Sequence, residues 1–215
     1  MALCERVSDT QDNHFVASIQ CNLTGRLFQC DPFCQQFSPG FGTTNCCQTF
    51  VDVKSHATFG INVLSDLPVE SSYSIIQYAS QAQIVQTLTS SSQALSRLGW
   101  LAYTGGLSDY AKSIELCQES LPRNGRKNLI FVIGGGLGDH RKASESKAVA
   151  AASLAKAGGA VIVPILISPG PTVHSGAMSF FQMMATEVVI DARKELSAVD
   201  RERFRDLLED AVKCR

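Results

Sequence analysis

Two uninterrupted apolar runs flank an alanine-rich stretch in this 215-residue chain, and this arrangement limits the possible folds more than any other feature. The first run lies at residues 128–133 (NLIFVI) and the second at residues 160–167 (AVIVPILI). Between them, residues 143–157 predict a helix that ends at a double glycine. Strands without polar alternation are typical of parallel sheets that are covered on both faces. The sequence therefore predicts an α/β fold with a doubly wound, mainly parallel sheet flanked by helices.

Shorter patterns extend this arrangement in both directions. Strands are predicted at residues 48–54, 73–79 and 83–88, with a hairpin joining the last two, and a final short strand at 187–190. Helices are predicted at residues 91–103, after a cap at Ser108, and from residue 197 onward. In such folds, ligands bind at the carboxyl ends of the strands, where Asp52, Ser108 and the glycines after residue 133 are expected.

The first 47 residues differ from the rest of the chain. They hold six of the eight cysteines and little regular periodicity: Cys4, Cys21, Cys30, Cys34, Cys46 and Cys47. This clustering predicts a loop-rich segment stapled by disulfides, with free thiols or a zinc site formed by four of these cysteines as alternatives. We therefore divide the chain into a Cys-rich segment, residues 1–47, and an α/β domain, residues 48–215.

The net charge and several short motifs indicate where the protein is located and what it binds. A net charge of −1 supplies no field for nucleic acid, and no apolar run approaches the about 20 residues of a membrane span. The start of the chain lacks the apolar core of a signal peptide, so a secreted protein would be represented here by a mature fragment with an added Met1. Residues 22–24 (Asn-Leu-Thr) form a glycosylation acceptor triplet, and together with the cysteines they favour an extracellular or cell-surface location.

The glycine run at residues 134–138 has two interpretations. Read as a dinucleotide loop, it offers Gly-x-Gly but has Asp139 in place of the last glycine, and it does not follow the first strand of the fold. No Gly-Lys-Ser/Thr triplet follows, which excludes a P-loop. A Rossmann-like nucleotide-binding protein remains the alternative to a tight turn between a strand and the next helix.

A longer pattern covers residues 48–215. A hairpin through Tyr78 is followed by a helix, a Gly-Gly-x-Ser entry that ends at Ser108, the apolar strand with its glycine exit, and the later helices and strands in order. This pattern resembles the von Willebrand factor type A domain. The resemblance implies a metal-ion-dependent adhesion site (MIDAS), in which an Asp-x-Ser-x-Ser loop, a Gly-Gly-x-Thr loop and a Thr-Asp-Gly loop hold a divalent cation that binds an acidic residue of the partner.

The resemblance also implies that this site is degenerate. Ser108 corresponds to the threonine of the second loop, whereas Gly135 stands where the third loop has its aspartate. The counterpart of the first loop is the stretch Asp52, Val53, Lys54, Ser55 and His56, which lacks both serine hydroxyls at the expected spacing. Mg²⁺ prefers several oxygen ligands, so only Asp52, Ser108 and Asp139 could contribute to a cation site. We expect no cofactor, and a hypothesis is that the Lys54 ammonium occupies the cation's place.

The function predicted from these features is binding to another protein. The sequence contains no Gly-x-Ser-x-Gly or His-Glu-x-x-His motif and no cysteine with a suitably spaced histidine and acid, so we expect no enzyme activity. A metal-independent adhesion or matrix-assembly module is predicted, with its upper-face binding residues at Asp52, Lys54, Ser55, Ser108, Gly135 and Asp139. Alternatives are a cytosolic assembly component with the same fold and a scaffold whose Cys-rich segment performs the recognition.

Overall fold

The computed structural model describes residues 13–20, 43–66, 71–79, 81–102, 109–121, 128–134, 142–167, 175–192, 201–202 and 205–206. The strands are β1 (Asn13–Gln20), β2 (Ser71–Tyr78), β3 (Ala82–Thr89), β4 (Asn128–Gly134), β5 (Ala160–Leu166) and β6 (Ile190–Asp191). The helices are α2 (Thr43–Ser65), α3 (Ser91–Trp100), α4 (Tyr110–Ser120), α5 (Lys142–Ala157) and α6 (Ser175–Met184). None of the described helices is long and apolar enough to cross a membrane.

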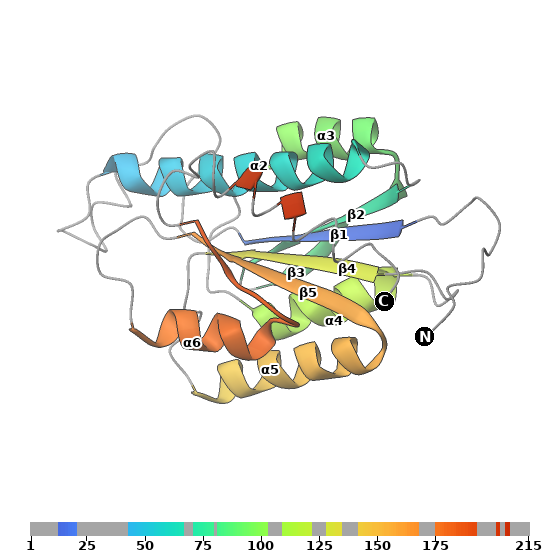
Figure 1. Ribbon diagram of the computed structural model, residues 1–215. Coiled ribbons are helices and arrows are strands. Elements are labelled where there is room, and N and C mark those ends of the chain that lie inside the picture. Colours follow the sequence, from blue (N-terminus) through green and yellow to red (C-terminus); the bar gives the residue numbers. More distant parts are fainter. Residues whose placement is uncertain are drawn as a thin grey trace.

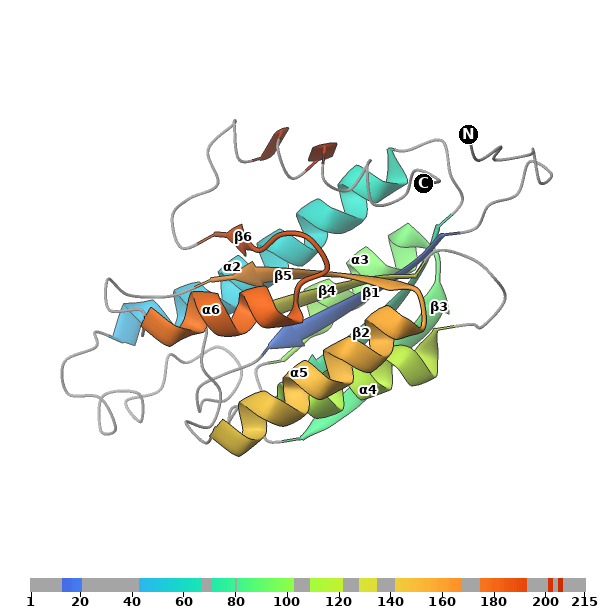
Figure 2. The ribbon, with the colours of Figure 1, turned by 60° about the horizontal axis from the view of Figure 1, so that its bottom comes forward.

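The molecule has three layers, with α2 and α3 on one face of a central sheet and α4, α5 and α6 on the other (Figure 1). The sheet has the strand order β3-β2-β1-β4-β5-β6. Every neighbouring pair is parallel except β2 and β3, which form an antiparallel hairpin. Figure 2 shows α4, α5 and α6 side by side over their face of the sheet. The predicted fold class, a doubly wound and mainly parallel α/β sheet, is confirmed.

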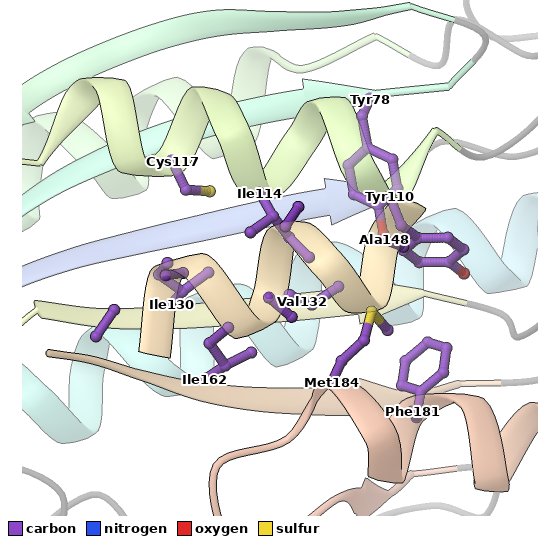
Figure 3. Packing of buried hydrophobic residues seen from close by; sticks show 14 of the residues in the cluster. Tyr78, Tyr110, Ile114, Cys117, Ile130, Val132, Ala148, Ile162, Phe181 and Met184 are labelled. Carbon is purple, nitrogen blue, oxygen red and sulfur yellow. The ribbon is translucent and has the colours of Figure 1, made fainter. Parts of the chain in front are cut away.

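Alternate residues of β4 and of β5 pack into two separate cores. In β4, Phe131 and Ile133 face α2, whereas Ile130 and Val132 face α4 and α5, and all four side chains are fully buried. Figure 3 shows the second core, in which Ile130, Val132 and Ile162 of the sheet lie against residues of three helices. Both faces of these strands are covered, which explains why their sequences are apolar at consecutive positions.

The largest correction concerns residues 43–65. The strand predicted at residues 48–54 is wrong, because these residues belong to the 23-residue helix α2. Val53, Ala57, Ile61 and Leu64 are spaced four, four and three residues apart and are all buried against the sheet. The predicted boundary at residue 48 falls inside α2. A stretch of seven residues, such as 48–54, is too short to distinguish the apolar spacing of a helix from that of a strand.

The central strand of the sheet lies in the segment that the sequence predicted to be loop-rich. β1 pairs with β2 on one side, from Asn13↔Ser71 onward, and with β4 on the other, from His14↔Asn128 onward. Its apolar residues are confined to positions 15–17 and 19, between stretches of the chain that contain the clustered cysteines. The prediction of a loop-rich segment is therefore wrong for residues 13–20.

The remaining predicted elements agree more closely with the structure. The strands at 73–79 and 83–88, their hairpin, the helix at 91–103, and the two apolar strands with the helix between them are confirmed within a few residues. The last strand lies at 190–191 rather than at 187–190, and α6 was not predicted. Of the helix predicted from residue 197, the described residues 201–202 and 205–206 are helical.

Helix α2 packs directly against Phe131 of β4 at Gly60. A Cβ atom added to Gly60 would lie 2.8 Å from Cε2 of Phe131, whose side chain is fully buried. We expect Gly60→Ala to lower the free energy of unfolding by about 1–3 kcal/mol, because the buried ring cannot move aside without disturbing the core. Urea denaturation monitored by circular dichroism would measure the loss.

Gly99 of α3 provides a matched control for this substitution. A Cβ atom at Gly99 would meet nothing within 4 Å. Gly99→Ala should therefore leave the free energy of unfolding unchanged or raise it by up to about 1 kcal/mol, through the better helix propensity of alanine. Equal stability of the two variants would contradict the close packing of α2 on β4.

Candidate functional site

The candidate site lies at the carboxyl edge of the sheet, around the end of β1. Gln20, the last residue of β1, is paired with Tyr78 of β2, and the preceding residue Ile19 is paired with Ile133 of β4. The chain leaves β1 toward β2 through α2, whereas β4 lies on the other side of β1. Such a switch point separates the loops on either side and creates the usual ligand-binding crevice of open α/β sheets.

The Tyr78 side chain links the strand ends at this edge of the sheet. Its hydroxyl donates a hydrogen bond to the carbonyl oxygen of Ile133, at 3.1 Å, and the contact is buried. Because β1 lies between β2 and β4, the Tyr78 side chain spans the central strand and links its two neighbours. The carboxyl ends of β1, β2 and β4 are thereby held together.

An aromatic cluster continues this support to the helices. The ring of Tyr110, the first residue of α4, lies 5.4 Å from that of Tyr78 and 5.4 Å and 5.7 Å from those of Phe180 and Phe181 in α6. Three of these contacts, including the one between Phe180 and Phe181, have the edge-to-face geometry that aromatic pairs prefer. Figure 3 shows Tyr78, Tyr110 and Phe181 at the same end of the second core. The start of α4 is therefore fixed relative to β2 and α6.

Hydrogen bonds also hold the backbone on both sides of residues 103–108. Before the loop, the side-chain amide of Gln77, which is buried in β2, donates a hydrogen bond to the carbonyl oxygen of Ala102. After the loop, the backbone N–H of Asp109 donates to the carbonyl oxygen of Ala79, at 2.9 Å. The Asp109 carboxylate accepts a hydrogen bond from the backbone N–H of Lys112, at 3.0 Å, and so caps α4. The predicted cap at Ser108 is wrong, since Asp109 performs that role.

The structure places the predicted first-loop residues in a helix and not in a loop. Asp52, Lys54 and Ser55 all belong to α2, in which Ser55 is exposed. The Lys54 ammonium donates a hydrogen bond to the carbonyl oxygen of Gly99, at 3.0 Å, and so links α2 to the end of α3. The assignment of residues 52–56 as a loop is therefore wrong, whereas the role of Lys54 at a cation site stays a hypothesis. Ser108, Gly135 and Asp139 lie outside the described residues, and their roles stay predictions.

The described part of this edge offers little to a hard cation. The described residues include no group of three or more His, Cys, Asp or Glu side chains that could hold a metal ion. Asp109 is the described carboxylate nearest to loop 103–108 in sequence, and its Oδ1 atom accepts the capping hydrogen bond of α4. The residues that the structure describes thus do not fit a Mg²⁺ site, which needs several oxygen ligands around one point.

A large exposed side chain near this edge was missed by the sequence analysis. Trp100, the last residue of α3 and the one tryptophan of the sequence, has 81% of its surface exposed. It precedes Ala102, whose carbonyl oxygen is bound by Gln77 at the end of β2. The signal was available in the sequence, since the one tryptophan lies in the last turn of the helix predicted at residues 91–103, shortly before Gly105 and Gly106.

Burial changes the acidity of one described side chain, and it lies away from this edge. Burial raises the pKa of the Tyr73 hydroxyl above its usual value, although a hydrogen bond with Ser65 acts in the opposite direction. The Tyr73 and Ser65 oxygens are 3.1 Å apart and join the end of α2 to the start of β2. This pair stabilises the opposite edge of the sheet and takes no part in the candidate site.

Comparison with known proteins identifies the fold. Residues 48–137 match the family model of the von Willebrand factor type A domain. The vWF domain of the type V pili tip protein Mfa5 from Porphyromonas gingivalis superposes with a TM-score of 0.69 at 8% identity, over 97% of this chain and 98% of that one. The chain has the von Willebrand factor type A fold. The predicted resemblance is confirmed.

Two further structures with this fold have low sequence identity to the chain. The minor pilin PilB from Streptococcus sanguinis has a TM-score of 0.67 at 9% identity, over 95% of this chain and 62% of that one. Proximal thread matrix protein 1 from the mussel byssus, with a zinc-occupied MIDAS motif, has a TM-score of 0.60 at 15% identity, over 95% of this chain and 45% of that one. The chain therefore spans about half the length of the mussel protein. No curated protein matches the chain in sequence.

The hydrogen bond between Tyr78 and Ile133 gives a test of how the carboxyl edge of the sheet is supported. Tyr78→Phe removes the hydroxyl and leaves the buried Ile133 carbonyl without that donor. We expect the free energy of unfolding to fall by about 1–2 kcal/mol, together with faster hydrogen exchange at the ends of β2 and β4. An unchanged exchange rate at these strand ends would contradict the proposed bracing of β2 to β4.

Proposed function

We propose that this type A domain is a non-enzymatic protein-binding module that acts in adhesion or in matrix or complex assembly. The fold supports this proposal, since several proteins that share it are, by their names, a pilus tip protein, a minor pilin and a byssal matrix protein. We further propose an extracellular or surface-associated location, in agreement with the clustered cysteines and the acceptor triplet at residues 22–24. Because β1 lies in the centre of the sheet, the domain is proposed to begin no later than residue 13.

We propose that binding does not require a metal ion. The observation that carries this proposal is that the first strand of the sheet ends at Gln20. In the family, the Asp-x-Ser-x-Ser loop follows the first strand, so its counterpart becomes Gln20, Cys21, Asn22, Leu23 and Thr24 instead of residues 52–56. Gln20 then stands in the place of the aspartate and has a neutral amide where the family has a carboxylate.

The third loop supports the same conclusion. Gly134 ends β4, and Gly135 follows at the position of the family's second carboxylate. With Gln20 and Gly135 at these positions, two carboxylates of the adhesion site are missing. Divalent hard cations depend on such charged oxygen ligands for their affinity, so a neutral set binds them poorly. The nucleotide-binding alternative is less well supported, because the glycine run follows β4 and not the first strand of the sheet.

Calorimetric titration of Mg²⁺ and Mn²⁺ into the chelator-treated protein tests metal independence. We expect no heat of binding for the wild-type chain. The double variant Gln20→Asp with Gly135→Asp should bind Mn²⁺, because it restores both missing carboxylates at adjoining strand ends. Heat of binding in the wild type would overturn the proposal.

A third variant tests the corrected position of the first loop. Asp52→Asn, added to the double variant, should leave Mn²⁺ binding unchanged, because Asp52 belongs to helix α2. Loss of binding in this triple variant would restore Asp52 as a ligand and would contradict the assignment of Gln20.

A further inference from the structure

The exposed end of helix α3 has the features of a protein-binding surface. Trp100 has 81% of its surface exposed, whereas its neighbours in sequence Leu98 and Leu101 are 1% and 6% exposed. Burying a tryptophan side chain is among the most favourable contacts that a protein surface can make. Tryptophan and arginine also dominate the residues that contribute most to protein–protein binding.

The backbone around Trp100 is held rigidly, although its ring is exposed. The backbone N–H of Leu101 donates to the carbonyl oxygen of Leu98, at 3.2 Å. Lys54 of α2 donates to the carbonyl oxygen of Gly99, and Gln77 of β2 donates to that of Ala102. Hydrogen bonds from two other elements thus hold the peptide carbonyl of Gly99, directly before the tryptophan, and that of Ala102, two residues after it. A side chain presented from a fixed backbone loses less conformational entropy on binding than one presented from a flexible loop.

The charge of this surface indicates the kind of partner. Arg97 precedes Trp100 by three residues, which places both side chains on the same side of α3. Arg97 is exposed, and the ion pairs of the described residues, at Lys112, do not include it. The sequence contains no Asp or Glu from residue 71 to residue 108, so no carboxylate of α3 or of the adjoining hairpin neutralises this cation.

We propose that Trp100 and Arg97 form a docking surface for a protein segment that carries a carboxylate next to an apolar side chain. The apolar side chain packs on the indole of Trp100, and the carboxylate accepts hydrogen bonds from the Arg97 guanidinium. Lys54 acts as a positioning residue, through its hydrogen bond to Gly99. This inference rests on the proposed protein-binding function and assigns that function to α3 instead of to a metal ion.

Selection of phage-displayed random peptides on the full chain provides the probe, with soluble Trp100→Ala protein present as competitor. We expect enriched peptides to contain Asp or Glu within three positions of a Leu, Ile, Phe or Trp residue. Peptides without acidic residues, or no enriched peptide, would overturn the assignment of the partner.

Synthetic versions of the enriched peptides, chosen without tryptophan, can then be titrated by fluorescence, because Trp100 is the one tryptophan of the sequence. Its emission should shift to shorter wavelength on binding as the indole leaves water. Arg97→Gln, or the replacement of the peptide's Asp by Asn, should raise the Kd about tenfold or more. For Trp100→Ala, calorimetry replaces fluorescence and should show a similar loss.

A matched control separates this surface from other binding sites. Leu154 of α5 is 68% exposed and lies on the opposite face of the sheet, so Leu154→Ala should bind the peptides like the wild type. Equal binding by Trp100→Ala and the wild type would overturn the inference and leave the protein-binding function intact. If neither the wild type nor any variant binds the peptides, although melting curves show that all of them are folded, both the inference and the proposed protein-binding function are contradicted.

Discussion

The parallel pairing of β1 with β2 and β4 is the constraint on which the rest of the structure depends. β1 is the one strand that joins the β3-β2 hairpin to the β4-β5-β6 half of the sheet. Without β1, α2 would have no central strand to cover, and the backbone edges of β2 and β4 that pair with β1 would have no partner strand. The strand has polar residues at positions 13, 14, 18 and 20, and backbone pairing with both neighbours supports its place in the sheet.

Polar side chains hold the backbone in place around the carboxyl edge of the sheet. Tyr78 and Gln77 each use a polar group to hold the backbone of a distant segment, at Ile133 of β4 and at Ala102, and Asp109 caps the start of its own helix α4. These groups are therefore committed to structure. Buried polar side chains with satisfied hydrogen bonds are well suited to this role, because they hold loop ends in one position.

The proposed change from metal-dependent to metal-independent binding has a simple electrostatic basis. A divalent cation offers a partner's carboxylate a strong, directional positive charge, and it requires carboxylates of its own to stay bound. Once those carboxylates are replaced by an amide and a glycine, a partner must be recognised by hydrogen bonds, cations on side chains, and apolar burial. Arg97 and Trp100 supply the last two at a position that the fold holds rigid.

The sequence by itself determined the fold class, the hairpin at Tyr78, and the strand-helix-strand unit from residue 128 to 167, because each of these is encoded by a continuous run of residues. The same local patterns failed at α2 and β1. Val53 is buried against the sheet together with Ala57 and Ile61, but the strand prediction considered only its immediate neighbours. The apolar residues of β1 are few, and they lie in the segment of the chain that holds most of the cysteines. Only the tertiary structure decided that Gln20 ends the central strand and that Lys54 binds Gly99, 45 residues away. Contacts between distant segments depend on how the layers pack, and no local spacing of residues records that packing.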